Sequence, residues 1–285
     1  KILKLHFSKM HGLGNDYVYI NCLNQKLKHP EEIARIVSDR HFGIGSDGLI
    51  LICPSDRADF QMRMFNADGS EGNMCGNGIR CVGKYVYDQG LTELTSIQIE
   101  TKSGVRSLDL TLGPDGTVSS VRVDMGKASL KAKDIPVETD YDDFISQPML
   151  VRGEVYLVTC VSMGNPHAVV FCDDVDNLPL AEIGPLFERH EKFPEGVNTE
   201  FIQLIDHKTL KMRVWERGSG ETFACGTGAC ASVAAAIVNE HCDFDEEVTV
   251  HLLGGDLKIT VHSDYTVLMD GPAVHVFDGD IELDA

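Results

Sequence analysis

The chain repeats itself at an offset of 150 residues, and this repeat limits its possible folds more than any other feature. The tetrapeptide Cys-Gly-Asn-Gly at 75–78 returns as Cys-Gly-Thr-Gly at 225–228, and Gly14-Asn15 returns as Gly164-Asn165. Further matches pair Phe65 with Trp215, Glu71 with Glu221 and Gly104 with Gly254. A repeat of this length far exceeds the roughly 20–50 residues of solenoid repeats. The chain is therefore expected to contain a duplicated domain with pseudo-two-fold symmetry.

Each half of the chain consists mostly of predicted β-strands. In the first half, alternating or β-branched runs predict strands at 16–22, 49–53, 60–65, 96–101 and 118–125. In the second half, the corresponding runs lie at 154–161, 167–172, 200–205, 210–216, 247–252 and 257–262. Strands of this kind, separated by short turns, favour a mostly antiparallel sheet in each half.

Two helices interrupt the strands of each half. Ile33, Ile36 and Val37 give residues 31–41 the apolar face of an amphipathic helix, and its repeat is expected at 179–190. The other helix begins directly after each Cys-Gly-x-Gly motif. Residues 229–238 are apolar nearly all round, which is typical of a buried helix. The sequence therefore predicts an α+β fold of two pseudo-symmetric domains, each a mostly antiparallel sheet or barrel wrapped around a central helix.

The domain boundaries follow from where the repeat ends. The first domain is expected to cover residues 1–125 and the second residues 126–272, because Met125-Gly126 and Asp270-Gly271 each close a predicted strand. The tail at 273–285 lies beyond the second repeat. We expect this tail to pack on the first domain.

The two Cys-Gly-x-Gly motifs carry the most chemistry. A cysteine at a helix N-terminus lies beside unsatisfied backbone N–H groups and the positive end of the helix dipole. This placement favours the thiolate, and such cysteines have pKa values of about 3.5–7.5. The adjacent glycines let a ligand approach the backbone, and exposed N–H groups can hold a carboxylate. Cys75 and Cys225 are therefore candidate reactive thiols, whereas a lone buried cysteine is usually only a small apolar residue.

One thiol in each symmetric half indicates a particular reaction. To invert a stereocentre, one group removes the α-proton from one face and a second group returns a proton to the other face. We expect Cys75 and Cys225 to face each other across the substrate as a thiol and a thiolate with coupled titrations. The sequence therefore predicts an amino-acid racemase or epimerase.

Composition limits the partners. The net charge is −19, with 44 acidic against 25 basic residues, so nucleic acid and anionic membrane surfaces are not expected partners. The chain shows no signal-peptide h-region and no apolar run long enough to span a bilayer. Nine cysteines without a Cys-x-x-Cys spacing predict reduced thiols and a cytoplasmic location.

Five motifs in order resemble those of the diaminopimelate epimerase family, from about residue 6 to the C-terminus. They are His-Gly-Leu-Gly-Asn-Asp at 11–16, Asn-Ala-Asp-Gly-Ser-Glu at 66–71, Met-Cys-Gly-Asn-Gly-Ile-Arg-Cys at 74–81, Ser-Met-Gly-Asn-Pro-His at 162–167, and Trp-Glu-Arg-Gly at 215–218 followed by Ala-Cys-Gly-Thr-Gly-Ala-Cys at 224–230. The resemblance implies an isomerase that interconverts L,L- and meso-2,6-diaminopimelate without pyridoxal phosphate or a metal. It also implies a role in lysine and peptidoglycan precursor synthesis.

The resemblance also implies roles for single residues. Cys75 would donate the proton and Cys225 would abstract it in the L,L-to-meso direction. The family substrate contacts correspond to Asn15, Asn66, Gly76, Asn77, Asn165, Asn198, Glu216, Arg217, Gly226 and Thr227. His167 and Glu216 match positions that tune the thiol pKa values. The guanidinium of Arg217 suits a carboxylate, and Glu216 suits an ammonium group. A homodimer is one expected assembly, although the sequence does not fix the oligomeric state.

One position departs from the family pattern, and two other functions stay open. Gly48 stands where some members carry a substrate-binding glutamine, so it can contribute only its backbone, and Ser46 and Asp47 are weak candidates instead. A proline or hydroxyproline racemase-like enzyme uses the same two thiols, but such enzymes resemble Cys-Gly-His-Gly at the first motif, where this chain has Asn77. A metal or redox-binding module could use Cys75 with Cys81 and Cys225 with Cys230, although these spacings do not match zinc motifs.

Overall fold

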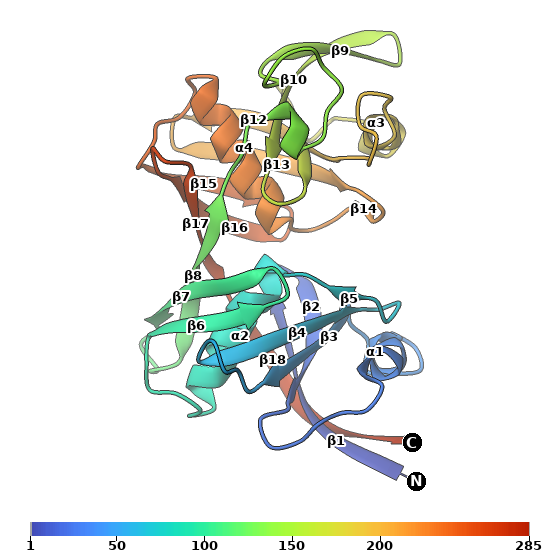
Figure 1. The fold of residues 1–285 in the computed structure, drawn as a ribbon, viewed down its shortest axis with the longest axis vertical. Coiled ribbons are helices and arrows are strands. Elements are labelled where there is room, and N and C mark those ends of the chain that lie inside the picture. The colour runs from blue at the N-terminus through green and yellow to red at the C-terminus, as the bar shows by residue number, and fades with distance from the viewer. Residues whose placement is uncertain (1, 285) are drawn as a thin grey trace. The chain divides into compact units, whose positions relative to one another are not determined.

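A computed structural model describes residues 2–284 of the chain. The chain divides into two compact units (Figure 1). The first unit runs to Val123 and takes up the chain again from Gly271, and the second unit runs from Asp124 to Asp270. In the described part of the chain, every helix is too short or too polar to cross a membrane.

The first unit contains two helices and a twisted, mixed sheet. Its helices are α1 (Pro30–Ser38) and α2 (Gly76–Asp88). Its strands are β1 (Ile2–Gly12), β2 (Asn15–Asn21), β3 (Gly48–Cys53), β4 (Phe60–Asn66), β5 (Glu71–Gly72), β6 (Ser96–Thr101), β7 (Gly104–Leu112), β8 (Val118–Lys127) and β18 (Val274–Asp284). The order is β18-β1-β2-β3-β4-β6-β7-β8, in which β2–β3 and β4–β6 are parallel and the other neighbours are antiparallel.

The second unit repeats this topology strand for strand. Its helices are α3 (Leu180–Glu188) and α4 (Gly226–Val238). Its strands are β9 (Gln147–Val151), β10 (Glu154–Ser162), β11 (Pro166–Phe171), β12 (Asn198–Asp206), β13 (Thr209–Glu216), β14 (Gly220–Glu221), β15 (Glu247–Leu252), β16 (Gly255–Val261) and β17 (Thr266–Pro272). The order is β9-β10-β11-β12-β13-β15-β16-β17, again with two parallel pairs, β11–β12 and β13–β15. The predicted α+β class with two β-rich repeats is confirmed.

The central helix of each unit is buried by its own strands. In α2, every residue from Asn77 to Val86 is buried, and the helix packs on β1, β2 and β7. The prediction that α4 is a buried helix is confirmed, because nearly the whole helix is buried against β10, β11, β12 and β16. The N-terminus of each central helix is thereby held in a fixed place within its unit.

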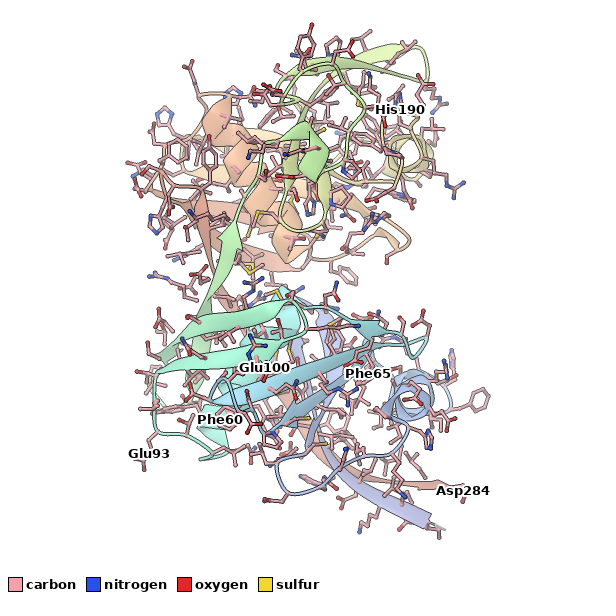
Figure 2. All side chains as sticks on the ribbon, viewed as in Figure 1. Phe60, Phe65, Glu93, Glu100, His190 and Asp284 are labelled. Carbon is pink, nitrogen blue, oxygen red and sulfur yellow. The ribbon has the colours of Figure 1, made fainter. Side chains whose placement is uncertain are left out.

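The smaller helix and the opposite face of the sheet form a second core in each unit. In the first unit, α1 packs on strands β3 and β4, and its partners include Phe65, which Figure 2 labels on β4. The predicted helix face is partly wrong, because Ile36 is 46% exposed while Ile33, Ala34 and Val37 are buried. The helix also ends at Ser38, since Asp39 turns to an extended conformation and its carboxylate accepts the N–H groups of His41 and Phe42.

Candidate functional site

Cys75 and Cys225 are the N-caps of α2 and α4, so each thiol lies at the start of a central helix. Both residues have extended backbone conformations, with φ of −131° and −124°. Each Sγ accepts a hydrogen bond from a backbone N–H, that of Gly78 or of Gly228, at 3.3 Å. A sulfur in this position satisfies one of the free N–H groups of the first helical turn.

The second glycine of each motif is required by close packing. A Cβ at Gly78 would lie 2.6 Å from Cδ1 of Ile50. A Cβ at Gly228 would lie 2.5 Å from Oε1 of Glu200 and 3.1 Å from the sulfur of Cys225. These glycines therefore let the start of each helix approach the strand beneath it.

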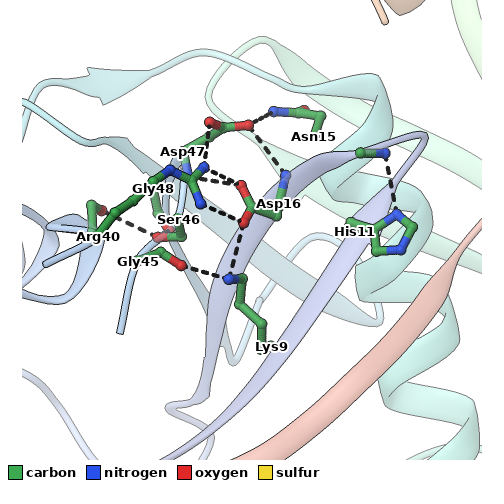
Figure 3. A network of polar contacts seen from close by, with 11 residues as sticks. Lys9, His11, Asn15, Asp16, Arg40, Gly45, Ser46, Asp47 and Gly48 are labelled. Carbon is green, nitrogen blue, oxygen red and sulfur yellow. Dashed lines mark hydrogen bonds and ion pairs between the residues drawn. The ribbon is translucent and has the colours of Figure 1, made fainter. Parts of the chain in front are cut away.

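Around Cys75, the polar groups form a short chain of amides. The thiol donates to Oδ1 of Asn15 at 3.3 Å, and Nδ2 of Asn77 donates to the same oxygen at 3.3 Å. The Nδ2 group of Asn15 donates to Asp47 at 2.7 Å (Figure 3). The hydroxyl of Tyr17 lies close enough to the sulfur for the two groups to shift each other's pKa. The structure thus brings Asn15 and Asn77 together with Cys75, as predicted for a common site.

Around Cys225, a buried histidine replaces the tyrosine. Nε2 of His167 lies 3.0 Å from Oδ1 of Asn165 and 3.1 Å from the hydroxyl of Thr227. The Thr227 hydroxyl lies 3.7 Å from the sulfur of Cys225. Nδ1 of His167 meets Oε1 of Glu200 at 2.7 Å, with both side chains fully buried. His167 therefore reaches the thiol through Thr227 and makes no direct hydrogen bond to it.

Glu216 is a second acidic group at Cys225. Its carboxylate accepts the hydroxyl proton of Thr222 and lies close enough to the Cys225 thiol for the two groups to shift each other's pKa. Burial raises the pKa of the Glu216 carboxyl, and the hydrogen bonds from Thr222 and Cys225 partly oppose this rise. Glu216 is thus placed to share a proton with the thiol.

Burial reverses the thiol acidity that the helix N-termini predict. It raises the pKa of the Cys75 thiol, although Gly78 N–H and Tyr17 oppose the rise. Burial, followed by the negative charges of Glu216 and Glu200, raises the pKa of the Cys225 thiol well above its usual value. The direction of both pKa shifts is therefore opposite to the expected low thiol pKa, because desolvation outweighs the stabilisation of the thiolate by backbone N–H groups.

Three further predicted contacts lie on the strand ends near these motifs. Asn66 donates to the hydroxyl of Ser70, which keeps its side chain within its own turn. The amide of Asn198 is buried and holds backbone groups, donating to Pro166 O at 2.9 Å and accepting from Arg217 N at 2.8 Å. The side chain of Arg217 is exposed and bonds to a backbone oxygen, that of Glu195. Asn198 thus positions the backbone of Arg217.

The weak candidates around Gly48 separate into structural and site-related residues. A Cβ at Gly48 would lie 2.1 Å from the carbonyl oxygen of Phe65, so this backbone leaves no room for a glutamine. The buried Ser46 hydroxyl donates to Gly48 O at 2.8 Å, which is a role within the turn. Asp47 instead reaches the site by accepting from Asn15.

The sequence interpretation missed Tyr17, Glu200 and Thr222. The repeat offset could have indicated Tyr17, because it is the counterpart of His167. Glu200 is an acidic residue in the otherwise uncharged, fully buried start of β12, a pattern that signals a paired carboxylate. Thr222 carries no comparable signal. Within residues 2–284, no group of three His, Cys, Asp or Glu side chains is placed to hold a metal ion.

Comparison with known proteins agrees with this architecture. A family model described as diaminopimelate epimerase matches residues 7–131 and 159–276. The diaminopimelate epimerase of Acetivibrio thermocellus is 55% identical over 280 residues, which cover 98% of this chain and 99% of that protein.

Two crystal structures share the fold at low identity. A PhzF-family phenazine biosynthesis protein from Bacillus anthracis is 18% identical, with a TM-score of 0.72 over 98% of this chain and 99% of that one. A hydroxyproline epimerase from Agrobacterium vitis is 15% identical, with a TM-score of 0.72 over 99% of this chain and 93% of that one. At such identities the likeness shows the fold alone. The family model and the identity to full-length relatives decide the matter: the chain belongs to the diaminopimelate epimerase family.

Proposed function

We propose that Cys75 and Cys225 exchange protons with the α-carbon of diaminopimelate and so interconvert its L,L and meso forms. Diaminopimelate epimerase function, an isomerase activity of lysine biosynthesis, follows from the full-length relatives. The observation that carries the assignment of the two thiols is their shared position. Each is the N-cap of a buried central helix, with its sulfur bonded to the second glycine of the motif.

The proton balance of the reaction is simple. In the L,L-to-meso direction, the Cys225 thiolate removes the α-proton and becomes a thiol. The Cys75 thiol gives its proton to the other face of the carbon and becomes a thiolate. The meso-to-L,L reaction uses the two groups in the opposite roles, and a second L,L-to-meso turnover first requires the net transfer of one proton from Cys225 to Cys75. The pair works with one proton shared between two sulfurs, so the two titrations are coupled.

The starting thiolate at Cys225 needs a proton acceptor, because burial and two carboxylates raise the pKa of this thiol. Glu216 fits this task, since it lies close enough to the thiol to act on its pKa and burial raises the pKa of its own carboxyl. Transfer of the thiol proton to Glu216 leaves a thiolate beside a neutral acid. The repulsion between the thiolate and the Glu216 carboxylate is then removed, while that from Glu200 stays.

The remaining residues suit the substrate's charged ends. The free N–H groups at the starts of α2 and α4 can hold the carboxylate at the reacting carbon, where negative charge develops as the proton leaves. The exposed guanidinium of Arg217 suits the distal carboxylate. The amides of Asn15, Asn66, Asn77 and Asn165 offer both donors and acceptors to the ammonium and carboxylate groups. Thr227 contributes its backbone N–H at the second helix, as Asn77 does at the first.

A cytoplasmic location and a homodimer belong to the same proposal.

The test is an incubation with L,L-diaminopimelate in D2O without added cofactor. Deuterium should enter at one α-carbon, and Cys75→Ala and Cys225→Ala should each abolish the turnover. Cys53→Ala and Cys172→Ala serve as controls, because these half-buried thiols lie at the end of β3 and just after β11, and neither caps a helix. Turnover that survives both substitutions at 75 and 225, or that requires pyridoxal phosphate, contradicts the proposal.

A further inference from the structure

We infer that Asp47 is a positioning residue, which turns the side-chain carbonyl of Asn15 toward Cys75 and so favours the thiol form of that cysteine. The inference rests on the proposed function, in which Cys75 is the proton donor of the L,L-to-meso direction. It adds a contact that keeps Cys75 protonated before this thiol donates its proton to the substrate.

The carboxylate of Asp47 fixes one end of the Asn15 amide. Oδ2 of Asp47 lies 2.7 Å from Nδ2 of Asn15, and a carboxylate can only accept. The opposite amide orientation would place two oxygens in contact. Asp47 is itself held by Asp16 N at 3.2 Å and by Arg40 at 3.2 Å, while Arg40 also pairs with the Asp16 carboxylate (Figure 3). The amide nitrogen of Asn15 must therefore face Asp47.

The other end of the amide chain gives the same orientation independently. Arg80 is fully buried and can only donate, and its Nη2 lies 2.9 Å from Oδ1 of Asn77. The Nδ2 group of Asn77 must then face Asn15, whose Oδ1 it meets at 3.3 Å. The hydrogen bonds at the Asp47 end and at the Arg80 end therefore require the same orientation of Asn15. In this orientation its side-chain oxygen points to Asn77 and Cys75.

The second repeat orients its equivalent asparagine in the opposite sense. Oδ1 of Asn165 lies 3.0 Å from Nε2 of His167, and its Nδ2 donates to Thr227 at 3.2 Å. The residue equivalent to Asp47 is the apolar Val197, which offers no acceptor at that place. Among the described residues, an asparagine carbonyl therefore receives a thiol proton in the first unit but not in the second. In the second unit His167, at the place of Tyr17, holds the asparagine oxygen, and no carboxylate stands at the place of Asp47.

An acceptor beside a sulfur stabilises the thiol, because only the protonated form can donate to it. Four other groups act on the pKa of Cys75, and all four lower it and so favour the thiolate: the backbone N–H groups of Gly78 and Asn77, the Tyr17 hydroxyl and the Arg80 guanidinium. The hydrogen bond from Cys75 to Asn15 exists only while the sulfur is protonated. The orientation of the Asn15 amide therefore shifts the balance between the thiol and the thiolate of Cys75.

The test measures alkylation of single cysteines by iodoacetamide in the ligand-free protein, with peptide mass spectrometry to separate them. Asp47→Asn keeps the size of the side chain, but its amide can either accept from Asn15 or donate to it. The forced orientation is lost, and Cys75 alkylation should rise about twofold to tenfold, as expected for one net hydrogen bond. Cys225 serves as the internal control and should not change. Glu71→Gln, which removes a carboxylate bonded to Arg63 in the same unit, should leave both rates unchanged.

A double-mutant cycle separates orientation from simple loss of charge. Asn15→Ala should itself raise Cys75 alkylation, and Asp47→Asn should add nothing in that background. An effect of Asp47→Asn that persists without Asn15, a rise shared equally by Cys75 and Cys225, or no rise at all overturns the inference. The measurement uses no substrate, so its outcome is independent of whether Cys75→Ala abolishes turnover.

Discussion

The buried pair of His167 and Glu200 tests how burial changes the contribution of such a pair to the free energy of unfolding. Its Nδ1–Oε1 distance is 2.7 Å, and both side chains are 0% exposed. The same unit contains a pair of equal geometry at its surface, His262 and Asp245, whose Nδ1–Oδ1 distance is also 2.7 Å at 40% and 58% exposure. The two pairs differ mainly in their contact with water.

Removal of the histidine should therefore have unequal costs. In the described part of the chain, Oε2 of Glu200 already lacks a hydrogen-bond partner, so His167→Ala leaves a buried carboxylate with little compensation. Such a loss destabilises a protein by about 3–5 kcal/mol. His262→Ala leaves a carboxylate that water can solvate, and exposed pairs contribute only about 0–1 kcal/mol.

Urea unfolding followed by tryptophan fluorescence measures the difference. The chain has one tryptophan, Trp215, which lies on β13 in the same unit as both pairs. His167→Ala should lower the midpoint strongly and His262→Ala hardly at all. Adding Glu200→Gln to His167→Ala should recover part of the loss, because it removes the unpaired charge. Equal midpoints for the two histidine variants, or a further loss on adding Glu200→Gln, would refute the reasoning.

Two other predictions concern packing and thiol acidity. Gly48→Ala should destabilise the protein by about 1–3 kcal/mol through overpacking, because the new Cβ would lie 2.1 Å from Phe65 O. Gly113→Ala is the control, because its Cβ would lie 3.3 Å from the side-chain oxygen of Asp115 and no nearer than 3.6 Å to Ser119 and Thr117. Thermal unfolding of the two variants measures the difference. Because burial raises the pKa of the Cys75 and Cys225 thiols, their alkylation rates should still rise with pH above the usual thiol pKa of about 8.5. A plateau of either rate below pH 8 would show that the helix N-terminus dominates instead.

Much of the fold was predictable because its signals are local. Alternating residues located β6 and β15 with their observed bounds. The central helices were expected directly after the glycine-rich motifs, but α2 and α4 begin inside them, at Gly76 and Gly226, because the cysteine is itself the N-cap. The amphipathic pattern of α1 was less reliable. Ile36 satisfies the helical period, yet it is exposed, because the short helix presents Ile33, Ala34 and Val37 to the sheet.

The repeat in the sequence determined the duplicated fold and the two thiols, since the cysteine of each Cys-Gly-x-Gly motif is the N-cap of the helix that follows it. The sequence did not determine the acidity of those thiols. That property depends on desolvation and on two carboxylates, Glu200 of β12 and Glu216 of β13, which the fold brings to Cys225 at the start of α4. The orientation of Asn15 is also a tertiary property, because Asp47 and Arg80 act on it from opposite ends of a hydrogen-bonded chain. Local patterns placed the reactive groups, whereas burial and non-local partners decided their protonation.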